Sequence, residues 1–230
     1  YRDIRKLKRR LTFSGVDVLV TKLEAQLYEN VFRPEESRRV HQIELLEKLQ
    51  EIKDLMVTNH HSLYINRVNS LINKVKIFGT WFASLDIRQD SRIHTAVIKN
   101  IDATLKENNK PGILPHHYDS FSQEEKINCL LNIDQVIGTA DTSTEIAKDT
   151  VESIFAINSI QQINGEQGCH RYIISNCQSA LNMIEVFTLF KLCGWNTQQL
   201  SVDIIPLFET IDDLKEAEQI MEWLYQLPIY

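Results

Sequence analysis

Three short runs rich in apolar, aromatic and β-branched residues limit the folds open to this chain of 230 residues. They lie at residues 81–87, 171–175 and 201–208, and each has the length and composition of a buried strand. Tens of mostly helical residues separate them, which favours parallel strands joined by helical crossovers. Because these crossovers are too long for a compact doubly wound sheet, we expect additional helices between the strands.

Helical patterns fill most of the remaining chain, which holds only 7 glycines and 5 prolines for tight turns. Pro34 lies near one expected helix start, where its missing N–H is tolerated, and Gly194 follows another helix. A Thr-Ser-Thr-Glu capping box begins at Thr142. Helices are predicted over 35–56, 63–78, from 142 onward and over 179–193. The stripe of the first is Val40, Ile43, Leu46, Leu49, Ile52 and Leu55.

Composition narrows the function classes. A formal net charge of -6 argues against a nucleic-acid partner, which would need a basic face. We interpret the basic run over residues 2–10 as a solvated helix face or subunit contact. No apolar stretch reaches the roughly 18 residues of a membrane span, and no basic-then-apolar leader opens the chain, so a cytoplasmic protein is expected. The 4 cysteines form no Cys-x-x-Cys pair, which indicates neither a zinc site nor a disulfide framework.

Charged side chains follow the predicted strands, at the edge where parallel strands place their ligands. Arg88 comes directly after the first run, and Glu209 directly after the third. A guanidinium fork suits a phosphate or carboxylate, and a lone carboxylate suits a hard cation such as Mg²⁺. A phosphorylated acid bound together with a divalent metal would use both.

Simpler explanations exist for the neighbouring polar residues. Asp212 and Asp213 are more often helix N-terminal charges than ligands. Asp86 could form a structural ion pair with Arg88 or another neighbour. The pair at residues 175–176 is more typical of a cap before the next helix. Adjacent histidines do not share a helix face, so His60-His61 and His116-His117 are interpreted as polar surface positions.

Three segments at these strand ends resemble motifs of the phosphoenolpyruvate carboxylases. The first is Leu-Asp-Ile-Arg-Gln-Asp-Ser at 85–91, preceded by Phe78-Gly79 and followed by His94. The second is Tyr-Ile-Ile-Ser at 172–175, followed by Gln178-Ser179 and Glu185-Val186, and the third is Pro-Leu-Phe-Glu-Thr-Ile-Asp-Asp-Leu at 206–214. Three motifs in the family's order are far more specific than any one of them.

The resemblance implies a role for two residues. Arg88 would be the catalytic and substrate-binding residue that contacts the phosphate of phosphoenolpyruvate, and Glu209 would be one of two carboxylates holding Mg²⁺ or Mn²⁺. Enzymes of the family are lyases of carbon dioxide fixation that supply the tricarboxylic acid cycle. They join bicarbonate to phosphoenolpyruvate through carboxyphosphate and a metal-stabilised enolate, giving oxaloacetate and phosphate. The implied partners are these small molecules, with no nucleic acid or membrane, and the parent would be a homo-oligomer.

The expected fold is mainly α with a few parallel β-strands, as part of a (β/α)8 barrel of the TIM type with long helical insertions. We expect a helical region at residues 1–78 and the partial barrel at 79–230. The family's catalytic-histidine motif, its Gly-rich loop and the second metal-binding Asp are absent, so the isolated chain is expected to be inactive. Two alternatives stay open, namely a non-catalytic helical scaffold and another Mg-dependent enzyme acting on phosphoenolpyruvate or a related enolate.

Overall fold

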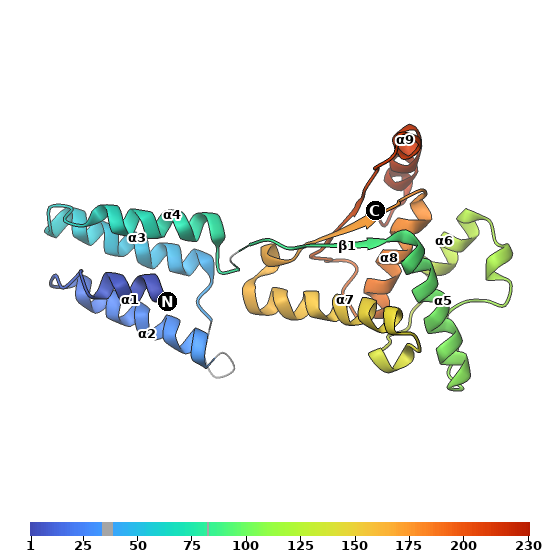
Figure 1. Ribbon diagram of the computed structural model, residues 1–230, viewed down its shortest axis with the longest axis horizontal. Helices are drawn as coiled ribbons and strands as arrows, with labels where there is room; N and C mark the ends of the chain where they lie inside the picture. The colour runs from blue at the N-terminus through green and yellow to red at the C-terminus, as the bar shows by residue number, and fades with distance from the viewer. Residues whose placement is uncertain (34–38, 82) are drawn as a thin grey trace. The chain divides into compact units, whose positions relative to one another are not determined.

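A computed structural model of the chain describes residues 1–33, 39–81 and 83–230. The described chain divides into two compact units, Tyr1–Ala83 and Ser84–Tyr230 (Figure 1). We call these unit 1 and unit 2. None of the helices in the described ranges combines the length and the apolar character that spanning a membrane requires.

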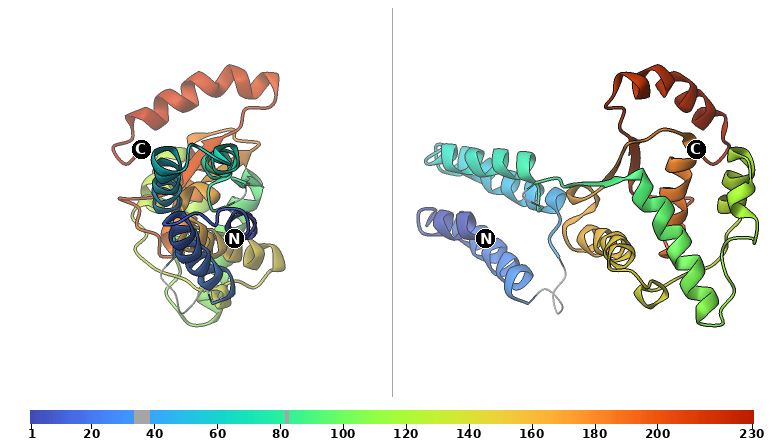
Figure 2. Two further views of the ribbon diagram at one scale, coloured as in Figure 1. Left: turned by 90° about the vertical axis from the view of Figure 1, so that its left-hand side faces the viewer. Right: turned by 45° about the vertical axis from the view of Figure 1, so that its right-hand side comes forward.

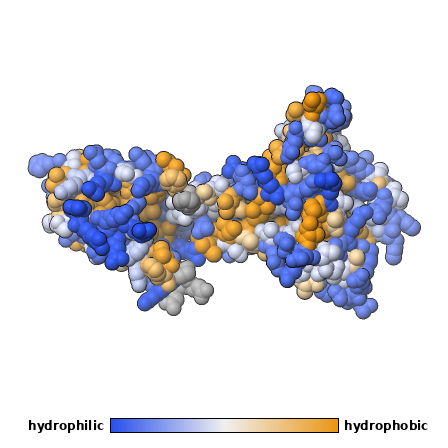
Figure 3. Space-filling model, viewed as in Figure 1, coloured by the Kyte–Doolittle hydropathy of each residue, from blue (hydrophilic) through white to orange (hydrophobic). Residues whose placement is uncertain are grey.

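Unit 1 is helical. Its core is formed by apolar side chains that recur every three or four residues along each helix, and hydrophilic residues cover much of its visible surface (Figure 3). The helices described in it are α1 (Arg2–Lys8), α2 (Val16–Phe32), α3 (Gln42–Asn59) and α4 (Ile65–Phe78). Helix α4 buries Val68, Ile72 and Val75, so the second predicted helix is confirmed apart from its first two residues.

The first predicted helix, α3, starts later than expected. Residues 34–38, including Pro34 and the expected start, lie outside the described residues, and the described helix begins at Gln42. Its buried face is Leu45, Leu49, Ile52 and Met56, whereas Ile43 is 73% exposed. An α-helix has 3.6 residues per turn, so the predicted spacing of three drifts around the helix, while alternating steps of four and three stay on one side.

Unit 2 contains a parallel sheet with helices packed against it. The strands are β1 (Asp86–Asp90), β2 (Arg171–Ser175) and β3 (Asp203–Pro206), in the order β1-β2-β3 and all parallel. The helices are α5 (Ser91–Glu107), α6 (Gln123–Leu131), α7 (Glu145–Asn164), α8 (Ala180–Leu192) and α9 (Ile211–Gln226). Short 3-10 turns lie at Tyr118–Ser120, Thr139–Asp141 and Glu166–Gly168. The prediction of a mainly α chain with a few parallel strands is confirmed.

The strands agree unequally with their predicted positions. β2 coincides with the predicted run, and β3 occupies the centre of its run. The prediction for β1 was wrong by several residues, because the strand covers Asp86–Asp90 rather than 81–87, of which Phe82 lies outside the described residues. Pairing with β2 sets this position, since Asp86 lies opposite Arg171 and Asp90 opposite Ser175.

The two faces of the sheet have different surroundings. One face, here called the covered face, packs against the helices: Tyr172 and Ile174 are buried in the core, and Ile87 and Ile204 pack against it. Helices α5 and α8 lie side by side in this layer (Figure 2). Side chains alternate along a strand, so the other, open face carries the remaining residues. These are Asp86, Arg88, Asp90, Arg171, Ile173, Ser175, Asp203 and Ile205.

Side-chain caps fix the helix starts around the sheet. The cap of α7 is Thr144, whose Oγ accepts from the N–H of Ala147, so the predicted start at Thr142 was two residues early. The Thr142 hydroxyl instead donates to the carbonyl of Thr139. The predicted limits of helix α8 are confirmed, because Gly194 follows its C-cap with a φ of 81°.

Candidate functional site

Arg88 lies at the centre of β1 on the open face, opposite Ile173 of β2. It was predicted to follow the strand, and the structure places it within the strand instead. Its side chain is exposed, and among the described residues it has no hydrogen-bond or ion-pair partner. A guanidinium fixed at its base by a strand and unpaired at its tip is suited to bind an anion.

The carboxylate of Asp86, two residues earlier on the same face, is paired elsewhere. Asp86 Oδ1 lies 2.9 Å from Nε of Arg171, the residue opposite it on β2. A terminal nitrogen of Arg171 also donates to the Ser84 hydroxyl at 3.3 Å. The structural ion pair considered for Asp86 is therefore present, with Arg171 rather than Arg88 as its partner. This pairing leaves Arg88 available for a ligand.

Asp90 holds the junction between β1 and α5. Its Oδ1 accepts from the backbone N–H of Arg92 at 2.9 Å, and its Oδ2 lies 2.7 Å from Nη2 of the same residue. The hydrogen bond from the Arg92 side chain lowers the pKa of Asp90. A charged carboxylate at this position satisfies an N–H at the start of α5 and favours the helix dipole.

The ends of β1 and β2 are joined by a buried hydroxyl. Ser91, 3% exposed, donates through Oγ to the carbonyl of Asn176 at 2.6 Å. The expectation that Ser175 and Asn176 cap the next helix was wrong, because Ser179 occupies that position. Asn176 has a φ of 52°, and this left-handed conformation turns the chain away from the strand before α8 can start.

Glu209 lies between β3 and α9 and is exposed. The neighbouring acidic residues have structural roles, which confirms their interpretation as helix N-terminal charges. Asp213 and Thr210 form a capping box, and Asp212 pairs with Lys215 at 2.8 Å. The backbone N–H of Thr210 lowers the pKa of Asp213. Among the described residues the Glu209 carboxylate has no such partner, although its backbone N–H donates to Asp213.

Arg88 and Glu209 belong to strands on opposite sides of β2. Neighbouring strands lie about 4.8 Å apart, so the backbones of β1 and β3 are separated by about 10 Å. Glu209 comes three residues after the last residue of β3, Pro206. No group of three or more His, Cys, Asp or Glu residues able to hold a metal occurs in the described ranges.

Sequence reasoning assigned no separate role to His94, which is fully buried. Its Nε2 lies 3.0 Å from the Tyr172 hydroxyl, and burial lowers its pKa to about 4. His94 falls on the inner face of α5 with Val97, Ile98 and Ile101. That apolar periodicity was the signal that could have identified it as a core histidine.

Glu185 is a second buried ionisable group, named in the second motif but given no separate role there. It is 2% exposed on α8 and accepts from the Thr95 hydroxyl at 2.9 Å and from the Asn182 amide at 3.4 Å. Burial raises its pKa. Its place between the apolar residues Ile184 and Val186 was the available signal that it faces the core.

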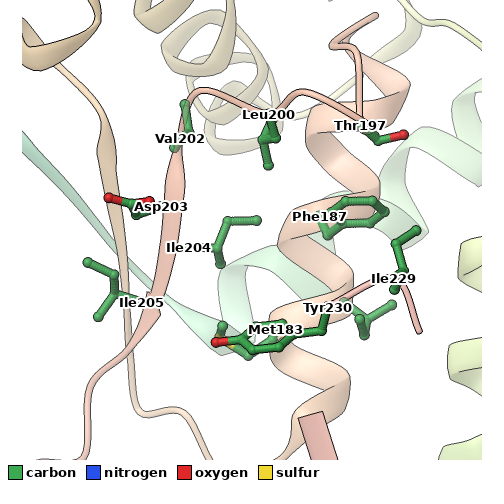
Figure 4. Close-up of a pocket in the computed structure, with 11 residues that line it drawn as sticks. Met183, Phe187, Thr197, Leu200, Val202, Asp203, Ile204, Ile205, Ile229 and Tyr230 are labelled. Carbon is green, nitrogen blue, oxygen red and sulfur yellow. The ribbon is translucent and has the colours of Figure 1, made fainter. Parts of the chain in front are cut away.

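A pocket of about 480 Å³ lies beside β3 (Figure 4). Phe187 of α8, Ile204 of β3 and Tyr230 near the chain end contribute to its mostly apolar lining, which includes neither Arg88 nor Glu209. β3 pairs only with β2 among the described residues, so the pocket lies along a strand edge that has no strand partner there.

Comparison with known proteins identifies the family. The family model described as phosphoenolpyruvate carboxylase matches residues 3–230. The chain belongs to the phosphoenolpyruvate carboxylase family. A phosphoenolpyruvate carboxylase of Prochlorococcus marinus (strain MIT 9215) is 35% identical over 193 residues, covering 79% of this chain and 18% of that protein. One of Parasynechococcus marenigrum is 33% identical, with the same coverage of both chains.

The similarity to phosphoenolpyruvate carboxylases extends to a relative of lower identity. The enzyme of a Synechococcus strain is 30% identical over 190 residues, covering 78% of this chain and 18% of its own length. The chain thus spans about 18% of the length of the curated relatives it matches. The segments that resemble phosphoenolpyruvate carboxylase motifs lie at the junctions of β1 with α5, β2 with α8 and β3 with α9.

Proposed function

We propose that the full-length protein containing this chain carboxylates phosphoenolpyruvate with bicarbonate, releasing oxaloacetate and inorganic phosphate. The observation that carries the proposal is the family match over residues 3–230. In this reaction a bicarbonate oxygen takes the phosphoryl group, which gives carboxyphosphate and the enolate of pyruvate. The enolate carbon then forms a bond to the carboxyl carbon, and phosphate leaves. The protein would act as a carbon–carbon lyase.

Arg88 would bind the phosphate of phosphoenolpyruvate. It projects from the open face. The carboxylate of Asp86, two residues before it on that face, is paired with Arg171. The carboxylate two residues after it, Asp90, is occupied by Arg92. Two paired acids therefore flank one unpaired guanidinium, which favours an incoming anion over an internal salt bridge. Its charge would stabilise the phosphoryl group as negative charge redistributes during transfer.

Glu209 would supply one oxygen ligand to Mg²⁺ or Mn²⁺. Carboxylate oxygens are the ligands that these hard cations prefer, and Glu209 is exposed at a strand end while Asp212 and Asp213 are engaged. A metal bound there would supply Lewis-acid stabilisation of the phosphate and of the developing enolate oxygen. Since one carboxylate is not enough to hold a metal firmly, the second acidic ligand would come from another part of the full-length protein.

The three strands would be consecutive members of a (β/α)8 barrel, with α6 and α7 as helical insertions. A doubly wound parallel sheet has helices on both faces, whereas the core of unit 2 contacts only one face of this sheet. In a barrel the uncovered face becomes the interior, and active sites lie at the carboxyl ends of the strands. Glu209, just beyond the end of β3, suits that arrangement, and Arg88 would project into the interior from the centre of β1.

Further features of the full-length protein are part of the proposal. It would be a cytoplasmic homo-oligomer of carbon dioxide fixation that supplies oxaloacetate to the tricarboxylic acid cycle. All four cysteines carry free thiols, as is usual in a reducing compartment. The chain of residues 1–230 would be inactive by itself, because it offers one carboxylate for the metal and lacks the family's catalytic-histidine motif.

The decisive test measures bicarbonate-dependent oxaloacetate formation by the full-length protein, coupled to NADH oxidation by malate dehydrogenase. We expect Glu209→Gln to lower kcat/KM by about 10²-fold or more, since the neutral amide is a poor metal ligand. Asp212→Asn is the matched control, an exposed acid in the same segment, and should stay within about twofold of the wild type. Equal losses in both variants would remove Glu209 from the metal site. Absence of oxaloacetate would refute the function and favour a scaffold.

The chain of residues 1–230 provides a second, independent measurement. In the same assay it should form no oxaloacetate at any Mg²⁺ or Mn²⁺ concentration. Measurable bicarbonate-dependent product from this chain would show that the machinery is complete within it, contrary to the proposal.

A further inference from the structure

The contact between Ser91 and Asn176 links two segments that are far apart in the chain. The Ser91 hydroxyl is the donor and the Asn176 carbonyl the acceptor, at 2.6 Å and across 85 positions of sequence. The Asn176 side-chain amide also approaches the same hydroxyl at 3.5 Å. The nearby bond from the Arg92 amide to Asp90 joins residues only two positions apart. Ser91 therefore fastens two separate strand ends, whereas Asp90 organises one segment.

This link lies where the backbone pairing of β1 and β2 stops. Asp90 and Ser175 are the last partners in the register, and Ser91 and Asn176 are the next residue on each side. The hydrogen bond from the Ser91 hydroxyl thus joins the two segments at the first position beyond the paired strand residues. It therefore extends the contact between the two segments by one residue past the last backbone pair.

We propose that Ser91 is a positioning residue for Arg88, holding the carboxyl end of β1 against β2 so that the guanidinium meets the substrate phosphate in one orientation. The inference rests on the proposed function. Arg88 comes three residues before Ser91, and its guanidinium has no side-chain partner among the described residues. Its direction is therefore set by its strand. A bidentate contact between a guanidinium and a phosphate depends on that direction.

Burial supports this role for Ser91. At 3% exposure the hydroxyl has little access to water, so the bond to Asn176 is not readily replaced by a solvent contact. Asn176 also holds a φ of 52°, a left-handed conformation that asparagine adopts more readily than most residues other than glycine. The hydrogen bond to its carbonyl is one of the contacts that maintain this conformation.

The test compares buried-hydroxyl variants of the full-length protein. We expect Ser91→Ala to raise KM for phosphoenolpyruvate about threefold to tenfold, the equivalent of one lost hydrogen bond, with KM for bicarbonate within about twofold of the wild type. Thr150→Val is the matched control, because Thr150 is also 3% exposed and donates to a carbonyl, that of Ile146, within α7. It should lower the melting temperature comparably and leave KM for phosphoenolpyruvate unchanged.

Two further variants separate positioning from general stability. Asn176→Gly keeps the accepting carbonyl and favours the positive φ, so KM for phosphoenolpyruvate should stay near the wild-type value. In an Arg88→Lys background, Ser91→Ala should cause no further rise in that KM, because the contact it orients is already altered. If Ser91→Ala is not recovered folded, Ser91→Cys, with its weaker donor, replaces it in the same comparison.

The outcomes are distinct. A rise in KM for phosphoenolpyruvate that is confined to the Ser91 variant and disappears in the Arg88→Lys background supports positioning. An unchanged KM in the Ser91 variant, an equal rise in Thr150→Val, or full additivity with Arg88→Lys overturns it while leaving the proposed function intact. A wild-type protein that makes no oxaloacetate overturns both proposals together.

Discussion

On the covered face of the sheet, Tyr172 and Ile174 are 1% and 0% exposed, whereas Asp86 and Arg88 on the open face are accessible to solvent. The two faces belong to the same strands and alternate residue by residue, so neighbours in sequence have different tasks. Burying an aliphatic or aromatic side chain contributes about 1.5–3 kcal/mol, while a surface ion pair contributes at most about 1 kcal/mol. Stability therefore comes mainly from the covered face, which leaves the open face free for ligand binding.

The largest expected effect is on the open face. Arg88→Ala in the full-length protein should lower kcat/KM for phosphoenolpyruvate about 10³-fold, since the charged group proposed to bind the reacting phosphate is lost, with little change in melting temperature. Lys148→Ala is the control, because its side chain is 58% exposed and its ion-pair partner, Glu152, lies in the same helix, α7. Steady-state kinetics measure this effect. A comparable loss of kcat/KM in the two variants would contradict a specific role of Arg88.

A second experiment compares the two faces with one residue type. Ile174 and Ile173 are adjacent in β2 and point to the covered and open faces, respectively. In denaturant unfolding of residues 1–230, Ile174→Ala should lower the free energy of unfolding by about 2–5 kcal/mol and Ile173→Ala by less than about 1.5 kcal/mol. Equal losses would mean that the two faces are equally packed.

The same pair also tests the proposed barrel. In the full-length protein, closure would bury the open face, so the cost of Ile173→Ala should rise toward that of Ile174→Ala. A cost that stays unchanged between the short and the full-length chain would argue that the open face remains uncovered, and so against the barrel.

The difference between the covered and the open face also explains which strands could be predicted from the sequence. β2 was predicted to the residue because its apolar run is flanked on both sides by strands and its covered side is fully buried. β1 was misplaced because its residues include Asp86, Arg88 and Asp90, which suggest a loop when considered alone. Their strand conformation depends on pairing with β2, a long-range contact that local composition does not report.

The candidate site could be predicted from the sequence only in part. The motifs named Arg88 and Glu209, and alternation along a strand accounts for the exposure of Arg88 once the true limits of β1 are known. Which acids are already engaged could not be inferred, because the Asp86 pair joins residues 85 positions apart in sequence and becomes adjacent only through strand register. The contact of His94 with Tyr172 is likewise a product of helix packing on the sheet.

Acid should weaken the covered face through His94. Its pKa is lowered to about 4 by burial, from about 6.5 in an unfolded chain, so the folded state binds fewer protons between these values. The stabilisation is complete above about pH 6.5 and is lost as the pH falls toward 4, amounting to about 3 kcal/mol. In denaturant titrations of residues 1–230 over this range, His94→Gln should flatten the pH dependence. An equally steep loss in the variant would assign it to other groups.

The smallest expected effect is at the ion pair on the open face. Asp86→Asn removes the charge opposite Arg171, whose side chain is 40% exposed, and should change the free energy of unfolding by only about 0.5 kcal/mol. High salt should shrink even this difference, because exposed charges are screened. Asp86 pairs with Arg171 and not with Arg88, so removing its charge does not alter the partners of Arg88. The variant should therefore leave KM for phosphoenolpyruvate within about twofold of the wild type. A loss above about 2 kcal/mol would show that the pair is shielded from water, and that the open face contributes to stability more than its exposure indicates.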